Sequence, residues 1–309
     1  MRPLRLVFVG MLFCTAAAAR PQSDRSQFST RTDMVVLHVS VEDRHGGYVP
    51  GLTKDAFSIL EGGQPQTISF FAPEDAPVTV GLILDNSGSM RPNRNQLIAA
   101  ALDFAATSHP QDEVFALRFD DDVRAVLPAD APFTGDPATL RAALVRSLSA
   151  RGRTALFDAV AAGLQYLNRG HYERKVLVVV SDGADNASRT TFQNVLARAR
   201  ASNALIYTVA LIDPVVRDNN PKLLKELARA TGGEAFRPKS IDEVGDVLKH
   251  IAQDIRHTYT LGFVSSNETH DGTYRPIRLV VQPPPGMKIK VRTRTGYVAG
   301  STRGRERRS

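Results

Sequence analysis

The chain has 309 residues, of which 42% are hydrophobic and 23% are charged, and its formal net charge is +7. These proportions are typical of a soluble globular protein, and the length allows one large domain or two modest ones. Four arginines lie in residues 300–309, which we expect to be a basic disordered tail, and two more lie among the first five residues. The remainder is close to neutral, so the composition indicates no basic groove for nucleic acid.

Residues 1–19 have the pattern of a secretory signal peptide. Two arginines precede the apolar run LVFVGMLFCTAAAA, which ends in small residues. We expect cleavage after Ala18 or Ala19 and export to the periplasm, cell envelope or medium of a bacterium, with an uncleaved anchor as the alternative. A lipid anchor at Cys14 is disfavoured, because a bulky phenylalanine precedes it. Cleavage would remove the only cysteine, which excludes disulfides and cysteine catalysis in the mature chain.

Residues 20–76 form the next region, which shows strand patterns only. Between Met34 and Ala72, β-branched and aromatic residues alternate with polar ones, and no helical period occurs. The patterned part has only about 40 residues, near the lower limit for a domain that folds by itself.

Residues 77–256 alternate short apolar runs with amphipathic stretches. The runs are VTVGLILD, EVFALRF, KVLVVVSD and ALIYTVAL, which are continuous, as in strands buried on both faces. This order predicts an α/β domain: a doubly wound, mostly parallel sheet with helices on both faces. The FDDDV stretch is expected to turn a hairpin that adds an antiparallel edge strand. Its tip is expected to be solvated rather than to rim the metal site or bind a second ion.

Residues 257–299 return to strand patterns, with the stretches TYTLGFVS, YRPIRLVVQ and KIKVRTRTGYV. This second flank is also too short to form a stable domain by itself. We therefore expect it to pair with residues 34–72 in one β-sandwich, into which the α/β domain is inserted.

Oxygen-bearing side chains gather at the ends of the predicted central strands. Asp85, Ser87 and Ser89 follow the first strand at alternating positions, which directs all three to one side of an extended segment. Asp182 follows a later apolar strand, and Thr154 precedes a predicted helix. Ligands of doubly wound sheets bind at the carboxyl ends of the strands, and hard oxygens suit Mg²⁺. The five residues therefore predict a divalent-metal site, whereas helix capping by itself would explain only one of the oxygens.

The DNSGS motif, the later threonine and the later aspartate resemble the von Willebrand factor type A domain, and the central region follows its order of strands and helices. The resemblance implies a metal-ion-dependent adhesion site that holds Mg²⁺ or Mn²⁺. By position, Ser87 and Ser89 match direct ligands, and Thr154 matches a ligand of the binding-competent state. Asp85 and Asp182 match carboxylates that act mainly through bound water. The resemblance also implies that an acidic side chain of a partner protein completes the metal shell.

The resemblance favours a secreted binding module over two alternatives. One is an accessory subunit of a chelatase or AAA ATPase machine, which the signal peptide disfavours. The other is a metallohydrolase, for which no general base stands beside the serines, so we expect no enzyme. In the resembled family the last helix of the domain shifts when a carboxylate binds. Here that helix runs almost directly into the second flank, and the junction either transmits the shift or is rigid.

Overall fold

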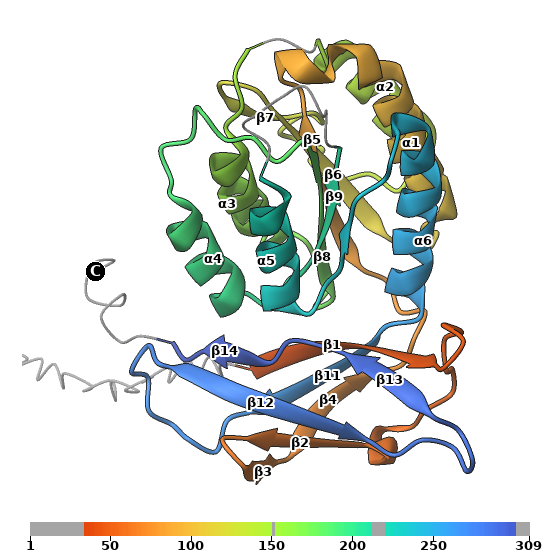
Figure 1. The fold of residues 1–309 in the computed structure, drawn as a ribbon, viewed down its shortest axis with the longest axis vertical. Coiled ribbons are helices and arrows are strands. Elements are labelled where there is room, and N and C mark those ends of the chain that lie inside the picture. Colours follow the sequence, from red (N-terminus) through yellow and green to blue (C-terminus); the bar gives the residue numbers. More distant parts are fainter. Residues whose placement is uncertain (1–33, 150–151, 212–219, 301–309) are drawn as a thin grey trace, which may run out of the picture. The chain divides into compact units, whose positions relative to one another are not determined.

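The computed structural model describes residues 34–149, 152–211 and 220–300 (Figure 1). All of them belong to one compact unit. The predicted signal peptide lies outside the described residues, as does the tail beyond Gly300.

The central region forms a six-stranded sheet. Its strands, in order across the sheet, are β10 (Ala235–Phe236), β9 (Leu205–Ala210), β8 (Lys175–Ser181), β5 (Thr79–Asp85), β6 (Glu113–Phe119) and β7 (Val123–Ala125). All neighbouring pairs are parallel except β6 and β7, which form the expected antiparallel hairpin. Every residue of β5 is buried, because its side chains enter two cores on opposite faces of the sheet.

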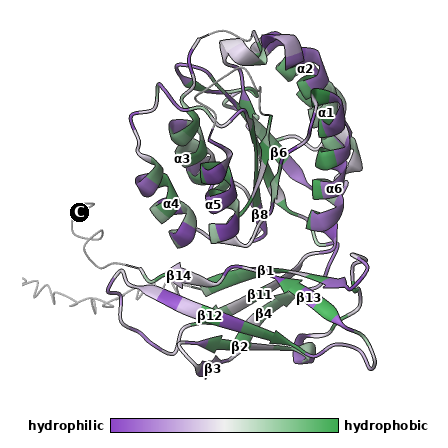
Figure 2. Cartoon of the chain, viewed as in Figure 1, coloured by the Kyte–Doolittle hydropathy of each residue, from purple (hydrophilic) through white to green (hydrophobic). Residues whose placement is uncertain are grey.

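Helices cover both faces of this sheet (Figure 1). One face carries α1 (Arg94–Thr107), α2 (Pro137–Ser147) and α6 (Val244–Arg256), and the other carries α3 (Leu156–Leu167), α4 (Phe192–Ala201) and α5 (Pro221–Thr231). Leu82 and Leu84 enter the first core and Ile83 enters the second. Figure 2 shows hydrophobic central strands and helices with both hydrophobic and hydrophilic sides. The predicted fold class is confirmed. Within the described ranges, no helix has the length and hydrophobicity needed to cross a membrane.

The two flanks pair into a β-sandwich. One sheet has the order β13 (Ile289–Arg292), β1 (Met34–Asp43), β11 (Tyr259–Val264) and β4 (Ile68–Ala72). The other has the order β14 (Gly296–Val298), β12 (Tyr274–Val281), β2 (Phe57–Glu61) and β3 (Gln64–Gln66). Each sheet combines strands from both flanks, as in the antiparallel pair of β1 and β11, where Leu37 lies opposite Leu261. The flanks therefore form the sandwich together, with the α/β domain inserted between them.

The sheet that contains β1 also contacts the α/β domain. Leu37 enters the sandwich core, whereas His38 and Ser40 face the α/β domain. His38 Nε2 lies 2.9 Å from the carbonyl oxygen of Asn203, which precedes β9. The sandwich thus contacts the amino-terminal edge of the central sheet, and the carboxyl ends of the central strands lie at the opposite edge.

Candidate metal centre

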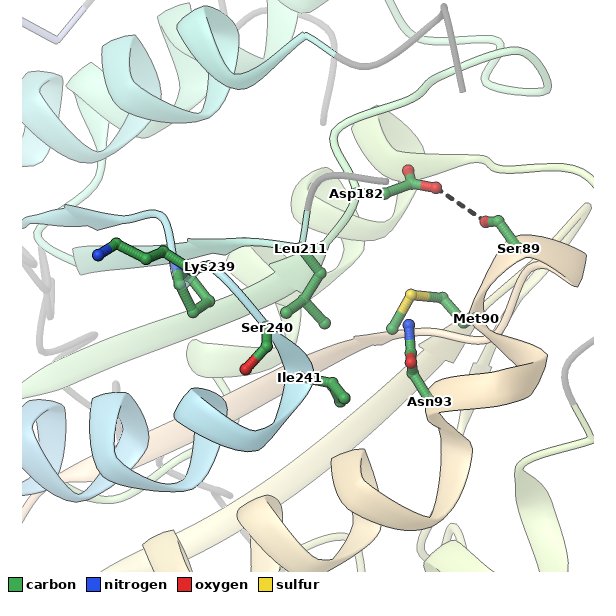
Figure 3. Close-up of a pocket in the computed structure, with 9 residues that line it drawn as sticks. Ser89, Met90, Asn93, Asp182, Leu211, Lys239, Ser240 and Ile241 are labelled. Atoms are coloured by element: carbon green, nitrogen blue, oxygen red, sulfur yellow. Dashed lines mark hydrogen bonds between the residues drawn. The ribbon is translucent and has the colours of Figure 1, made fainter. Parts of the chain in front are cut away.

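Two serine hydroxyls and one carboxylate meet at the carboxyl ends of the neighbouring strands β5 and β8. Ser87 follows β5, and the short 3-10 helix η2 (Gly88–Asn93) begins directly after it. The Ser87 and Ser89 hydroxyl oxygens lie 3.0 Å apart, and the Ser89 hydroxyl donates to Asp182 Oδ2 at 2.8 Å (Figure 3). Ser87 and Asp182 are each 2% exposed, whereas Ser89 is exposed to solvent. The cluster therefore opens outward at Ser89.

Asp85 stands behind these hydroxyls. Its Oδ1 accepts a hydrogen bond from the Ser87 backbone N–H at 2.9 Å, and its Oδ2 accepts one from the Ser181 hydroxyl at 2.7 Å. Burial and then the negative charge of Asp182 raise the pKa of Asp85 to about 6. A nearby cation would stabilise the ionised form of a buried carboxyl such as Asp85.

Thr154 reaches the cluster through its loop. The Gly88 N–H donates to the Gly152 carbonyl at 3.1 Å, which joins this loop to the serine segment. The Thr154 N–H donates to Asn186 Oδ1 at 2.9 Å, and its carbonyl accepts from the N–H groups of Asn186 and Ala187. The structure therefore brings Ser87, Ser89 and Asp182 into direct contact, adds Asp85 through Ser87 and Ser181, and links Thr154 through backbone contacts.

A polar network beside the site was missed by the sequence analysis. Asn86, which is 1% exposed, donates from Nδ2 to Asp120 Oδ2 at 2.9 Å and accepts from the Ser149 N–H at 2.8 Å. Asp120 also pairs with Arg118, and its side chain is only 14% exposed. The prediction of a solvated hairpin tip is thus wrong for this residue, because Asn86 and Arg118 compensate its desolvation. Asn86 is part of the DNSGS motif and could have been recognised as a site residue. Its partner Asp120 lies 34 positions away, so the hydrogen bond itself has no local signal.

The opposite side of the hairpin tip contacts the Thr154 loop. Asp121 Oδ1 accepts from Arg153 Nε at 2.7 Å, and Asp121 Oδ2 accepts from the Arg153 N–H at 3.2 Å. The Ala155 N–H donates to the Asp120 carbonyl at 2.8 Å. The acidic hairpin therefore holds the loops of the candidate site rather than forming a separate ion site.

The donor set fits a hard divalent cation. It consists of three hydroxyls and two carboxylates, at Ser87, Ser89, Thr154, Asp85 and Asp182. Oxygen ligands of this kind suit Mg²⁺ or Mn²⁺, whereas zinc and copper prefer nitrogen and sulfur. Within the described part of the chain, no three His, Cys, Asp or Glu side chains cluster as a metal site. A metal site built here would therefore need the three hydroxyls as ligands beside the two carboxylates.

Comparison with known proteins identifies the family of the central region. The model of the von Willebrand factor type A domain matches residues 80–250, more than half of the chain. The chain belongs to this family. The family expected from the DNSGS motif is thereby confirmed. No curated protein matches the chain significantly.

Solved structures show the same fold at low sequence identity. A von Willebrand factor type A protein from Catenulispora acidiphila is 14% identical with a TM-score of 0.50, and the match covers 90% of this chain and 76% of that one. Proximal thread matrix protein 1 from the mussel byssus is also 14% identical with a TM-score of 0.50, covering 61% of this chain and 48% of that one. BatB from Bacteroides thetaiotaomicron is 18% identical with a TM-score of 0.45, and the match covers 58% of this chain and 97% of that one. At these identities the two matches with a TM-score of 0.50 show the fold alone.

Proposed function

We propose that this protein is a metal-dependent binding module that engages an acidic side chain of a partner protein. The cation, Mg²⁺ or Mn²⁺, would be held by Asp85, Ser87, Ser89, Thr154 and Asp182. Membership of the von Willebrand factor type A family supports an interaction module. The observation that carries the proposal is the hydrogen-bonded contact of Ser87, Ser89 and Asp182, of which Ser89 is exposed to solvent.

The chain's own residues explain why such a site would bind a carboxylate. Both oxygens of Asp85 are engaged by Ser87 and Ser181, so this carboxylate stays behind the hydroxyls. Asp182 is likewise held, because its Oδ1 accepts from the Ala184 N–H at 3.0 Å. A cation at this site would supply an electropositive coordination position for an incoming carboxylate. The exposed Ser89 lies where a partner can approach.

Calorimetry of Mg²⁺ binding tests the proposal. We expect Asp182→Ala to lower the affinity for Mg²⁺ by at least about 10-fold, because the carboxylate that organises Ser89 is lost. Asp185→Ala is the matched control, since Asp185 lies in the same loop but accepts from the Phe157 N–H and the Ser188 hydroxyl. Equal affinities in wild type and Asp182→Ala, with the fold intact by circular dichroism, would refute the metal assignment.

We also propose that the mature protein is exported to the bacterial cell envelope or medium. The support is the basic start and short apolar run of residues 1–19. Mass spectrometry of the exported form should find an N-terminus near Arg20. An intact chain beginning at Met1 in the cytosol would contradict this proposal.

A further inference from the structure

Ser181, the last residue of β8, stands beside Asp85 at the carboxyl ends of the central strands. Ile83 of β5 lies opposite Val179 of β8, and both side chains enter the second core. Asp85 and Ser181 follow two positions later on the same strands, so their side chains leave the same face of the sheet. Ser181 is fully buried, and its hydroxyl donates to Asp85 Oδ2 at 2.7 Å. The pairing of the two strands therefore brings this serine to Asp85.

The same hydroxyl holds the turn that carries Asp182. The Gly183 N–H donates to Ser181 Oγ at 3.1 Å, which fixes the peptide unit that joins Asp182 to Gly183. A hydroxyl has one proton to donate, and here the Asp85 carboxylate accepts it while the Gly183 N–H occupies a lone pair. One buried side chain thus contacts both segments that bear the carboxylates, the end of β5 and the turn after β8.

We propose that Ser181 is a positioning residue of the metal centre, which holds Asp85 and Asp182 in the places where they would act on the cation. This inference rests on the proposed function, since both carboxylates belong to the proposed site. Ser181 has no exposed surface, and both of its hydrogen bonds are made to the carboxylate-bearing segments, so it acts through them rather than as a ligand. Alanine would leave the Gly183 N–H and one Asp85 oxygen without this partner, which loosens both segments.

Calorimetry of Mg²⁺ binding to the full chain tests the inference. Ser181→Ala should lower the affinity for Mg²⁺ by at least about 10-fold, as the loss of a residue that orients metal ligands does. Ser181→Thr keeps the hydroxyl and should restore the affinity to within about threefold of wild type. In the metal-free protein, the Gly183 amide proton should exchange with solvent faster in Ser181→Ala than in wild type, because its acceptor is gone.

Ser188→Ala is the matched control. The Ser188 hydroxyl donates to Asp185 Oδ1 at 2.5 Å and accepts from the Asp158 N–H at 3.1 Å, which is the same pattern of contacts in the loop that follows β8. Its carboxylate partner is not one of the proposed metal-site residues. The affinity of this variant for Mg²⁺ should therefore stay within about twofold of wild type.

The inference alone would be overturned by an affinity of Ser181→Ala within about twofold of wild type, or by an equal loss of affinity in Ser181→Thr. Loss of the folded state in Ser181→Ala, measured by circular dichroism, would also overturn it, because the hydroxyl would then serve the fold as a whole. In each of these cases the wild type still binds Mg²⁺. Absence of Mg²⁺ binding by the wild type would instead overturn the proposed function.

Discussion

The Asp254 carboxylate of α6 and the Arg292 guanidinium of β13 form an ion pair across the junction between the α/β domain and the sandwich. The Asp254 side chain is 1% exposed and the Arg292 side chain 18%. The Tyr207 hydroxyl donates to Asp254 Oδ2 at 2.6 Å, and the Ser40 hydroxyl donates to Oδ1 at 3.1 Å. Burial and the charge of Asp254 raise the pKa of Tyr207 well above its usual value, so this hydroxyl keeps its proton. One carboxylate therefore holds β1, β9 and β13 together.

Removing this carboxylate should destabilise the whole protein. Asp254→Ala leaves the largely buried Arg292 guanidinium with only the Glu234 carboxylate, 3.8 Å from its Nε, and removing one partner of a buried ion pair costs up to about 3–5 kcal/mol. Asp246→Ala, an exposed position on the same helix, should change the free energy of unfolding by less than about 0.5 kcal/mol. Urea unfolding of the two variants makes the comparison. A similar small effect of both substitutions would show that the ion pair contributes little.

The junction after α6 should behave as a rigid connection. Only His257 and Thr258 separate α6 from β11, and the Arg174 guanidinium donates to the carbonyls of Ile255 and Thr258. The same guanidinium donates to the Ala76 carbonyl on the incoming segment, so both connections to the sandwich are held.

Glycine insertion tests the rigid connection. Three glycines after Arg256 should lower stability but leave the affinity for Mg²⁺ and for a glutamate peptide within about twofold. A change of about fivefold or more would fall in the range of allosteric coupling and would favour transmission through α6.

Acid should weaken the sandwich junction through His38. Burial lowers the pKa of His38 to about 4, and the charges of Arg174 and Arg294 act in the same direction. The ring faces the Asn203 carbonyl and lies 3.4 Å from the Thr260 hydroxyl, so it is neutral in the folded protein. The unfolded chain takes up a proton below its ordinary pKa of about 6.5 and the folded chain does not. The stability that His38 contributes is therefore present above pH 6.5 and is lost as the pH falls from there through about 4, by up to about 3 kcal/mol.

The measurement is urea unfolding between pH 8 and pH 4 for wild type and His38→Gln. Glutamine keeps a donor near Asn203 but has no titrating ring, so the variant should lose less stability on acidification. His250→Gln is the control, because His250 is exposed, and the pH dependence of its free energy of unfolding should match that of wild type. Parallel pH profiles of wild type and His38→Gln would contradict the prediction.

The acidic hairpin should influence metal affinity without contacting the metal. Asp120→Ala removes the partner of Asn86 and Arg118, which frees the segment that carries Ser87 and Ser89. Loss of such a supporting contact lowers metal affinity by about 10-fold. Asp122→Ala alters the same hairpin at a 66% exposed side chain and should have no measurable effect. Calorimetry measures the Mg²⁺ affinity of both variants. Equal affinities of Asp120→Ala and Asp122→Ala would show that the hairpin does not support the metal site.

Local sequence patterns were sufficient to predict the fold class and the centre of the candidate site. Continuous β-branched runs such as Val178–Val180 have no polar side, so they become stable only when helices cover both faces of their sheet. Two positions of separation keep Ser87 and Ser89 together, although Ser89 lies in the 3-10 helix η2 and not in the extended segment that the sequence predicted. These outcomes depend on residues a few positions apart, and a local pattern is enough to specify them.

The contacts that support the site and the junction were decided by the tertiary structure. Asn86 meets Asp120, Asp254 meets Arg292, and His38 meets Asn203 across 34, 38 and 165 positions of the chain. Asn86, Asp254 and His38 are of residue types that also occur on protein surfaces, so their sequence does not reveal that they are buried. Their burial is tolerated only because packing brings a complementary group within hydrogen-bonding distance. No local pattern specifies the remote partner, since the partner depends on the order of strands in the central sheet for Asn86 and on the packing of the flanks against the inserted domain for Asp254 and His38.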